Sequence, residues 1–136
     1  MLRIVDISLC FCSLAARMDG ERKYDLEERT AVFGEDVIAF AQGIPVNQIT
    51  RSLIDQLVRA GTSVGANYCE ADDAHTKKEF RHKLSYCRKE SRETKHWLRM
   101  MAKAVPDCRD HSLVLWKEAH ELNLIFSSII RNSATD

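Results

Sequence analysis

Apolar residues recur along the chain with the spacing of helices, in four separate stretches. The first stretch begins at Asp25, which has capping-box spacing to Glu28. Steps of four and three residues then keep one set of positions on a single face of a helix. These positions are Leu26, Thr30, Phe33, Val37, Phe40 and Ile44. Gly43 and Pro45 predict the end of this helix.

The second stretch opens at Asn47, a favourable N-cap residue. Its inner face is predicted to hold Leu53, Leu57, Ala60, Val64, either Asn67 or Tyr68, and Ala71. Gly61 and Gly65 stand inside it, and each glycine costs a helix about 1 kcal/mol relative to alanine. The helix could break there, but the apolar period continues without a change of phase. We therefore expect a continuous helix whose two glycines lie against another helix.

The third stretch starts at Thr76, where Glu79 has capping-box spacing. Its apolar face comprises Phe80, Leu84, Cys87, Ser91, Thr94, Leu98 and Met101. Nothing before residues 105–107 would stop a helix of about 28 residues, roughly 42 Å long. The fourth stretch starts near Asp110 and is expected to fray after Arg131. Its inner face comprises Leu115, Ala119, Leu122, Phe126 and Ile129.

Four amphipathic helices with short connections predict an all-α fold, an antiparallel up-down-up-down four-helix bundle over residues 24–133. Residues 1–23 are predicted to be an extension outside it, either disordered or preceding a true start at Met18. The apolar run at residues 4–16 is too short to span a membrane, and Asp6 interrupts it as a signal peptide. We therefore expect no membrane association.

The composition is that of a globular protein, with 45% apolar and 29% charged residues among 136. The five cysteines are odd in number and contain no C-x-x-C pair. Reduced thiols in a cytoplasm are the simplest interpretation. No metalloprotease, hydrolase or phosphate-loop motif occurs, and the histidines are scattered. The sequence thus predicts a protein that is not an enzyme and has no cofactor or metal.

One polar group could still do acid–base chemistry. Glu90 and Glu93 frame Trp97, and Arg59 on the preceding helix could lie opposite them. Such a set can transfer protons. Buried charges more often pair with each other and fix helix register, and we favour that structural interpretation.

Charge is distributed unevenly. Residues 75–103 hold ten Lys or Arg and three Glu, a net charge of +7 in a chain that is neutral overall. Six of these cations recur at intervals of three, four and seven residues, and they are here called the basic ridge: Lys78, Arg81, Arg88, Arg92, Lys95 and Arg99. A basic flank attracts the phosphates of RNA or DNA without reading sequence. Alternatively, it could meet an acidic face on the first helix of a neighbouring copy, formed by Glu27, Glu28, Glu35 and Asp36.

Several motifs resemble one known family. They include Tyr24-Asp25-Leu26, Ile44-Pro45, the segment QLVRAGTSVGANY at 56–68, and Glu93-Thr94 with Trp97-Leu98. They resemble the four-helix-bundle proteins first noticed in intervening sequences of bacterial 23S ribosomal RNA genes, which are similar to the accessory protein of diversity-generating retroelements. The resemblance covers about residues 24–131. Cys69 stands at a position where relatives commonly have Arg, and Asp72 and Asp73 make the following loop less basic.

The resemblance implies a cytoplasmic bacterial protein that assembles as a homopentamer and has no known catalysis. For the retroelement relatives it also implies a basic surface that binds nucleic acid and a reverse transcriptase. We therefore expect a non-enzymatic homo-oligomeric scaffold that binds RNA or DNA through the basic ridge. The alternative is a purely structural assembly in which the ridge makes the contacts between subunits.

Overall fold

The computed structural model describes residues 25–134, and the expectation for residues 1–23 lies outside this range. The described part contains no strand. It consists of one short 3₁₀ helix, η2 (Pro106–Cys108), and four α-helices: α2 (Leu26–Gln42), α3 (Gln48–Asp72), α4 (Lys77–Ala104) and α5 (Arg109–Ser133). The predicted all-α class is confirmed. The last helix ends two residues beyond the fraying expected at Arg131.

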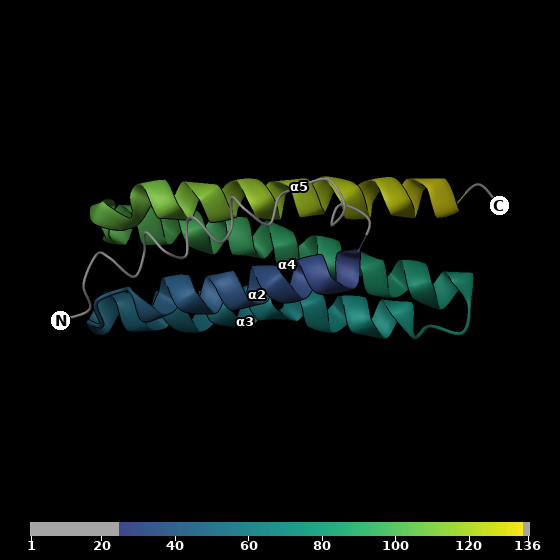
Figure 1. Cartoon of the computed structure of the whole chain (residues 1–136), viewed down its shortest axis with the longest axis horizontal. Helices are drawn as coiled ribbons and strands as arrows, with labels where there is room; N and C mark the ends of the chain where they lie inside the picture. Colours follow the sequence, from purple (N-terminus) through teal and green to yellow (C-terminus); the bar gives the residue numbers. More distant parts are fainter. Residues whose placement is uncertain (1–24, 135–136) are drawn as a thin grey trace.

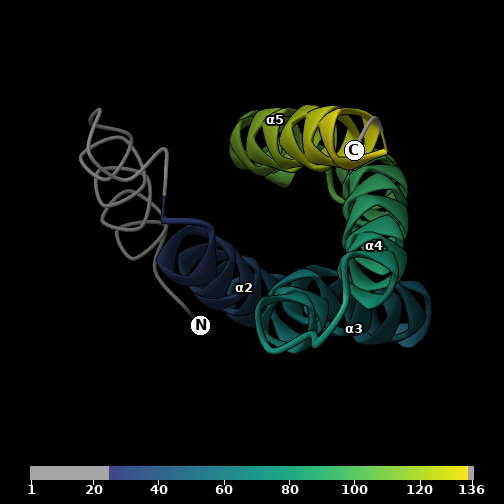
Figure 2. The same ribbon diagram turned by 90° about the vertical axis from the view of Figure 1, so that its right-hand side faces the viewer.

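The helices form a four-helix bundle in which successive helices run in opposite directions (Figure 1). Seen along the bundle, they follow an arc in chain order, with α2 and α5 at its two ends (Figure 2). Short connections enforce this order, because a helix that ends within a few residues of the next must pack beside it.

Side-chain caps fix the starts of α2, α3 and α4 much as the sequence predicted, whereas α5 begins without a side-chain cap. Asn47 accepts hydrogen bonds from the backbone N–H groups of Ile49 and Thr50, both at 2.9 Å. The hydroxyl of Thr50 accepts a reciprocal bond from the N–H of Asn47. At α4, Thr76 accepts from the N–H of Glu79 at 3.1 Å. The Glu79 carboxylate accepts from the N–H of His75 rather than that of Thr76, so the expected reciprocal box is shifted by one residue.

The apolar faces predicted for the four helices meet in one core. Each helix contributes side chains that are fully buried, including Val37, Leu57, Leu98 and Phe126. Phe80 and Ile129, at the ends of the apolar faces of α4 and α5, are only partly buried. The periodicity therefore located the core. Burial is incomplete near the end of the bundle where these two apolar faces terminate.

Glycines bring α2 and α3 into close contact. A Cβ atom on Gly61 would lie 2.8 Å from a methyl carbon of Val37, which is itself fully buried. A Cβ on Gly65 would lie 3.2 Å from the backbone oxygen of Thr30. Both distances are shorter than an ordinary carbon contact. The predicted role of these two glycines against another helix is confirmed, and that helix is α2.

A buried ion pair joins the two ends of the arc. Arg29 on α2 donates to Glu118 on α5 through Nε at 2.7 Å and Nη2 at 3.1 Å. Its Nη2 also lies 3.1 Å from an oxygen of Glu121. The side chains of Arg29 and Glu118 are only 12% and 8% exposed. A bidentate pair of this kind fixes direction as well as distance, so it sets how α5 lies against α2.

Replacing Gly65 by leucine should destabilise the bundle by about 1–3 kcal/mol, because the side chain must displace the backbone of α2. The measurement is the melting temperature by circular dichroism. Gly34→Ala is the matched control, since its Cβ would make an ordinary contact 3.5 Å from the Cα of Thr62. We expect that variant to be unchanged or stabilised by up to about 1 kcal/mol through helix propensity. An unchanged melting temperature for Gly65→Leu would contradict the close contact.

Candidate nucleic-acid interface

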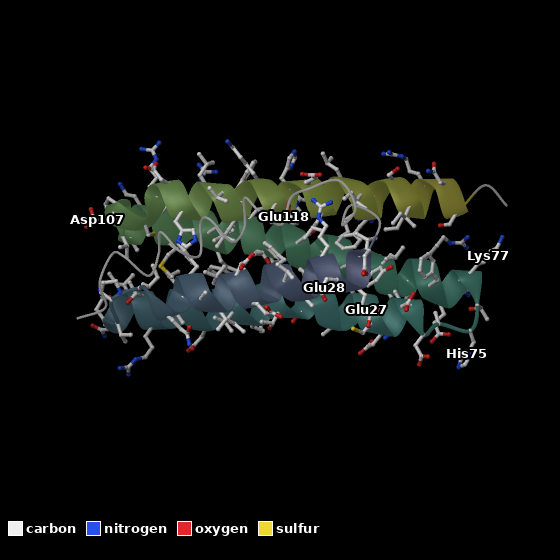
Figure 3. The ribbon with its side chains drawn as sticks, viewed as in Figure 1. Glu27, Glu28, His75, Lys77, Asp107 and Glu118 are labelled. Carbon is white, nitrogen blue, oxygen red and sulfur yellow. The ribbon has the colours of Figure 1, made fainter. Side chains whose placement is uncertain are left out.

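The basic ridge lies along one flank of α4, beside α5. At 100° per residue, its six cations fall within an arc of roughly 100°. The helix spans the bundle: Lys77 lies at one end, while Asp107, just after its last residue, lies at the other (Figure 3). The buried side chains of α4 lie about 100° around the helix from the ridge, which leaves the ridge on a flank outside the core. The predicted common flank is therefore present along the length of the molecule.

Four members of the ridge extend to solvent. Lys78, Arg88, Arg92 and Arg99 are exposed. Within residues 25–134, no ion pair engages any of these four. They are therefore cations available to a partner.

The other two members turn toward α5. Arg81 donates to the backbone oxygen of Ser133 at 2.7 Å. Lys95 lies 3.1 Å from Nδ1 of His120 and 5.0 Å from the centre of the Trp116 ring. Both side chains are partly buried. They add positive potential to the ridge, but their side chains contact residues of α5 in the same molecule.

One further cation shares the ridge and was not predicted. Lys103 is exposed and follows Arg99 by four residues, hence on the same flank of α4. The spacing that defined the ridge would have included it.

The seam with α5 is held by Asn123, whose amide donates to the backbone oxygen of Arg88 at 2.9 Å and to the hydroxyl of Ser91 at 3.1 Å.

The polar group between α3 and α4 is an ion-pair network. Arg59 contacts Glu93 at 2.6 Å and Glu90 at 3.5 Å. Burial, followed by repulsion from Glu93, raises the pKa of Glu90 above its ordinary value, and Arg59 opposes that rise. Glu70 pairs with Lys83 at 2.6 Å in the same seam. These contacts support the structural interpretation of Glu90 and Glu93.

Two of the three cysteines in the described range are buried, and Cys69 is exposed. Burial raises the pKa of Cys87 to about 12 and that of Cys108 to about 11, so both stay protonated at neutral pH. Residues 25–134 contain no group of three or more His, Cys, Asp or Glu placed to hold a metal ion. In the same range, no helix is both long and apolar enough to cross a bilayer.

The proposed acidic partner surface on α2 needs one correction. Glu27, Glu28 and Glu35 are exposed, as expected. Asp36 is only 8% exposed and lies on the inner side of α2. Its position next to the core stripe, one residue before Val37, turns it inward. The exposed acidic face of α2 therefore has three members of the predicted set.

Two comparisons with known proteins found a match. The family model described as "23S rRNA-intervening sequence protein" matches residues 22–105. A crystal structure from Bacteroides thetaiotaomicron VPI-5482, described as a protein of unknown function from the S23 ribosomal protein family, is similar with a TM-score of 0.71. The two chains are 27% identical, over 77% of this chain and 94% of the other. None of the curated proteins matches the chain.

The raised pKa of Glu90 predicts a pH-dependent stability. A carboxyl whose pKa is higher in the folded state binds its proton more tightly there, so folding loses stability as pH rises through that pKa. Glu90→Gln should therefore raise the melting temperature at about pH 7 and give a smaller gain at about pH 4. Glu93→Gln is the comparison: it replaces the 2.6 Å ion pair with Arg59 by a neutral contact but also removes the repulsion that helps to raise the pKa of Glu90, so it should raise the melting temperature less than Glu90→Gln does at about pH 7. A lower melting temperature for Glu90→Gln at neutral pH would show that pairing with Arg59 outweighs burial.

Proposed function

The chain belongs to the 23S rRNA-intervening sequence protein family, as its motifs predicted, and we propose that it is a non-enzymatic homo-oligomeric scaffold. In this proposal the scaffold binds nucleic acid along the basic ridge of α4. The family name concerns 23S rRNA genes and assigns no activity. RNA is nevertheless the first ligand to test, with DNA of the same length beside it.

One observation supports the ridge as the binding surface: its four solvent-facing cations are free of ion pairs in the described part of the chain. From Lys78 to Arg99 they extend about 32 Å at 1.5 Å per residue. A row of this length can follow several successive phosphates of one strand. Arginine and lysine side chains that contact phosphates fix position without reading bases. The proposed binding is therefore strong at low salt and nearly independent of sequence.

Self-association is the second part of the proposal. The family resemblance implies a homopentamer, and two exposed surfaces of opposite charge support contacts between copies. The ridge itself could serve as the basic surface, opposite Glu27, Glu28 and Glu35 of a neighbour. In that alternative the protein is a purely structural assembly and the ridge is not free to bind nucleic acid.

Replacing both Arg88 and Arg92 by Glu should weaken binding of single-stranded RNA and DNA, measured by fluorescence anisotropy over a range of salt concentrations. If about three phosphates are neutralised per subunit, the unmodified protein should show a slope of log affinity against log salt of about −2 to −3. The double variant should lose about two thirds of that slope. It should remain folded, because both residues are exposed.

The control for this experiment is the single variant Arg51→Glu, and its binding is compared with that of the single variant Arg92→Glu. Arg51 is also an exposed arginine, but it lies on α3, away from the ridge. Light scattering on the same samples separates the alternatives. If the ridge makes subunit contacts, the double variant dissociates while residual binding of nucleic acid is unchanged. If the unmodified protein binds neither RNA nor DNA at low salt, the nucleic-acid proposal is refuted.

A further inference from the structure

The outward face of α5, which is exposed to solvent, carries leucines as well as cations. Leu113 and Leu124 are 48% and 54% exposed. They lie eleven residues apart, which places them about 20° apart around the helix and roughly 16 Å apart along it. Three exposed cations complete this face, here called the α5 stripe: Arg109, Leu113, Lys117, Leu124 and Arg131. A partner helix that docks along this line would bury both leucines at once.

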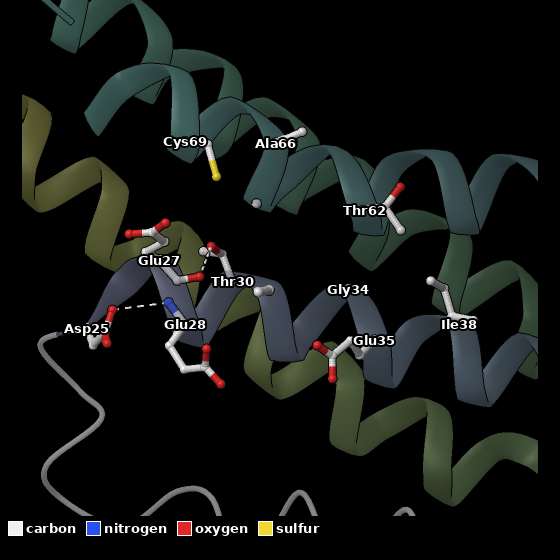
Figure 4. A pocket seen from close by; sticks show the side chains of 12 residues that line it. Asp25, Glu27, Glu28, Thr30, Gly34, Glu35, Ile38, Thr62, Ala66 and Cys69 are labelled. Atoms are coloured by element: carbon white, nitrogen blue, oxygen red, sulfur yellow. Dashed lines mark hydrogen bonds between the residues drawn. The ribbon is translucent and has the colours of Figure 1, made fainter. Parts of the chain in front are cut away.

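A complementary surface exists between α2 and α3. A groove of about 540 Å³ follows the seam of these helices (Figure 4). Small residues dominate its lining: Ala31, Gly34, Thr62, Gly65 and Ala66. Glu27, Glu28 and Glu35 border it on the α2 side. The groove results from the glycines, because residues without bulky side chains leave the outer surface of the α2–α3 contact hollow.

We propose that the α5 stripe of one copy docks into the α2–α3 groove of a second copy. Glu27 and Ile38, which both line the groove, are eleven residues apart on α2, the same separation as the two leucines of the stripe on α5. The leucines would pack over the small residues, where a helix can approach closely. The three cations of the stripe would face the three glutamates that border the groove.

The occupant of the groove is a second copy rather than nucleic acid, because its glutamates repel phosphate. Leucines likewise gain nothing from a phosphate backbone. The proposal rests on the self-association proposed above and gives it a surface. Because stripe and groove are different patches, the contact is heterologous, and repeated docking gives a ring or an open chain. α2 and α5 are the ends of the arc, so each copy presents one patch at each end (Figure 2). The ridge on α4 remains free.

The experiment uses one variant for each patch. Leu124→Glu places a charge in the stripe, and Ala66→Tyr fills the groove at an exposed position. By light scattering at micromolar concentration, the unmodified protein should have several times the chain mass of 15.6 kDa. Each variant alone should fall to one chain mass. Ile49→Glu is the matched control, since Ile49 is 67% exposed but lies on neither patch, and it should keep the full mass.

Mixing the two variants gives the decisive result. A Leu124→Glu copy has an intact groove, and an Ala66→Tyr copy has an intact stripe, so the mixture should form a pair of about twice the chain mass. Circular dichroism of each variant establishes that it is folded. If either folded variant keeps the unmodified mass, or if the mixture stays at one chain mass, this interface is refuted. If the unmodified protein is itself a monomer, self-association fails as well, and the salt-dependent binding of RNA still tests the ridge separately.

Discussion

The close contact between α2 and α3 is the constraint on which much else depends. Gly61 and Gly65 remove the side chains that would hold the two backbones apart, so Val37 and Thr30 of α2 lie directly against α3. Two glycines inside one helix cost about 2 kcal/mol in helix propensity. Packing against α2 offsets that cost, which explains why α3 runs unbroken from Gln48 to Asp72. The same contact leaves a hollow on the outside, and a surface groove is therefore a consequence of how the core is closed.

Electrostatics then divides the outer surface. Arg29 and Glu118 neutralise each other at the buried joint between α2 and α5. Arg59 and Glu93 do so between α3 and α4. Exposed charges of one sign gather in places: glutamates border the α2–α3 groove, whereas the basic ridge follows α4 and three cations lie on the outward face of α5. A molecule that is neutral as a whole thus presents surfaces of opposite sign, which favours ordered contacts between copies over nonspecific attraction.

Periodicity was sufficient to predict the helices, the stripes and the contact of the two glycines, because all three depend on where Cα atoms lie. It could not predict where long side chains end. Lys95 and Arg81 start on the same flank as Arg92, yet their flexible chains reach His120 and Ser133 of α5. Asp36 was assigned to the acidic face from its neighbours in sequence, but it sits beside the core stripe and is buried. The α5 stripe was missed because exposed leucines become informative only when the opposite face is known to be filled.

The central claim is that α4 contacts nucleic acid while α2 and α3 do not. Ultraviolet cross-linking of the unmodified protein to a single-stranded RNA, followed by mass spectrometry of the linked peptides, tests it most directly. The account predicts links within residues 77–104, on the helix that carries Arg88, Arg92 and Arg99. They should disappear when salt is raised, since phosphate contacts are screened. Links confined to α2 and α3, or links within α4 that persist at high salt, would contradict it.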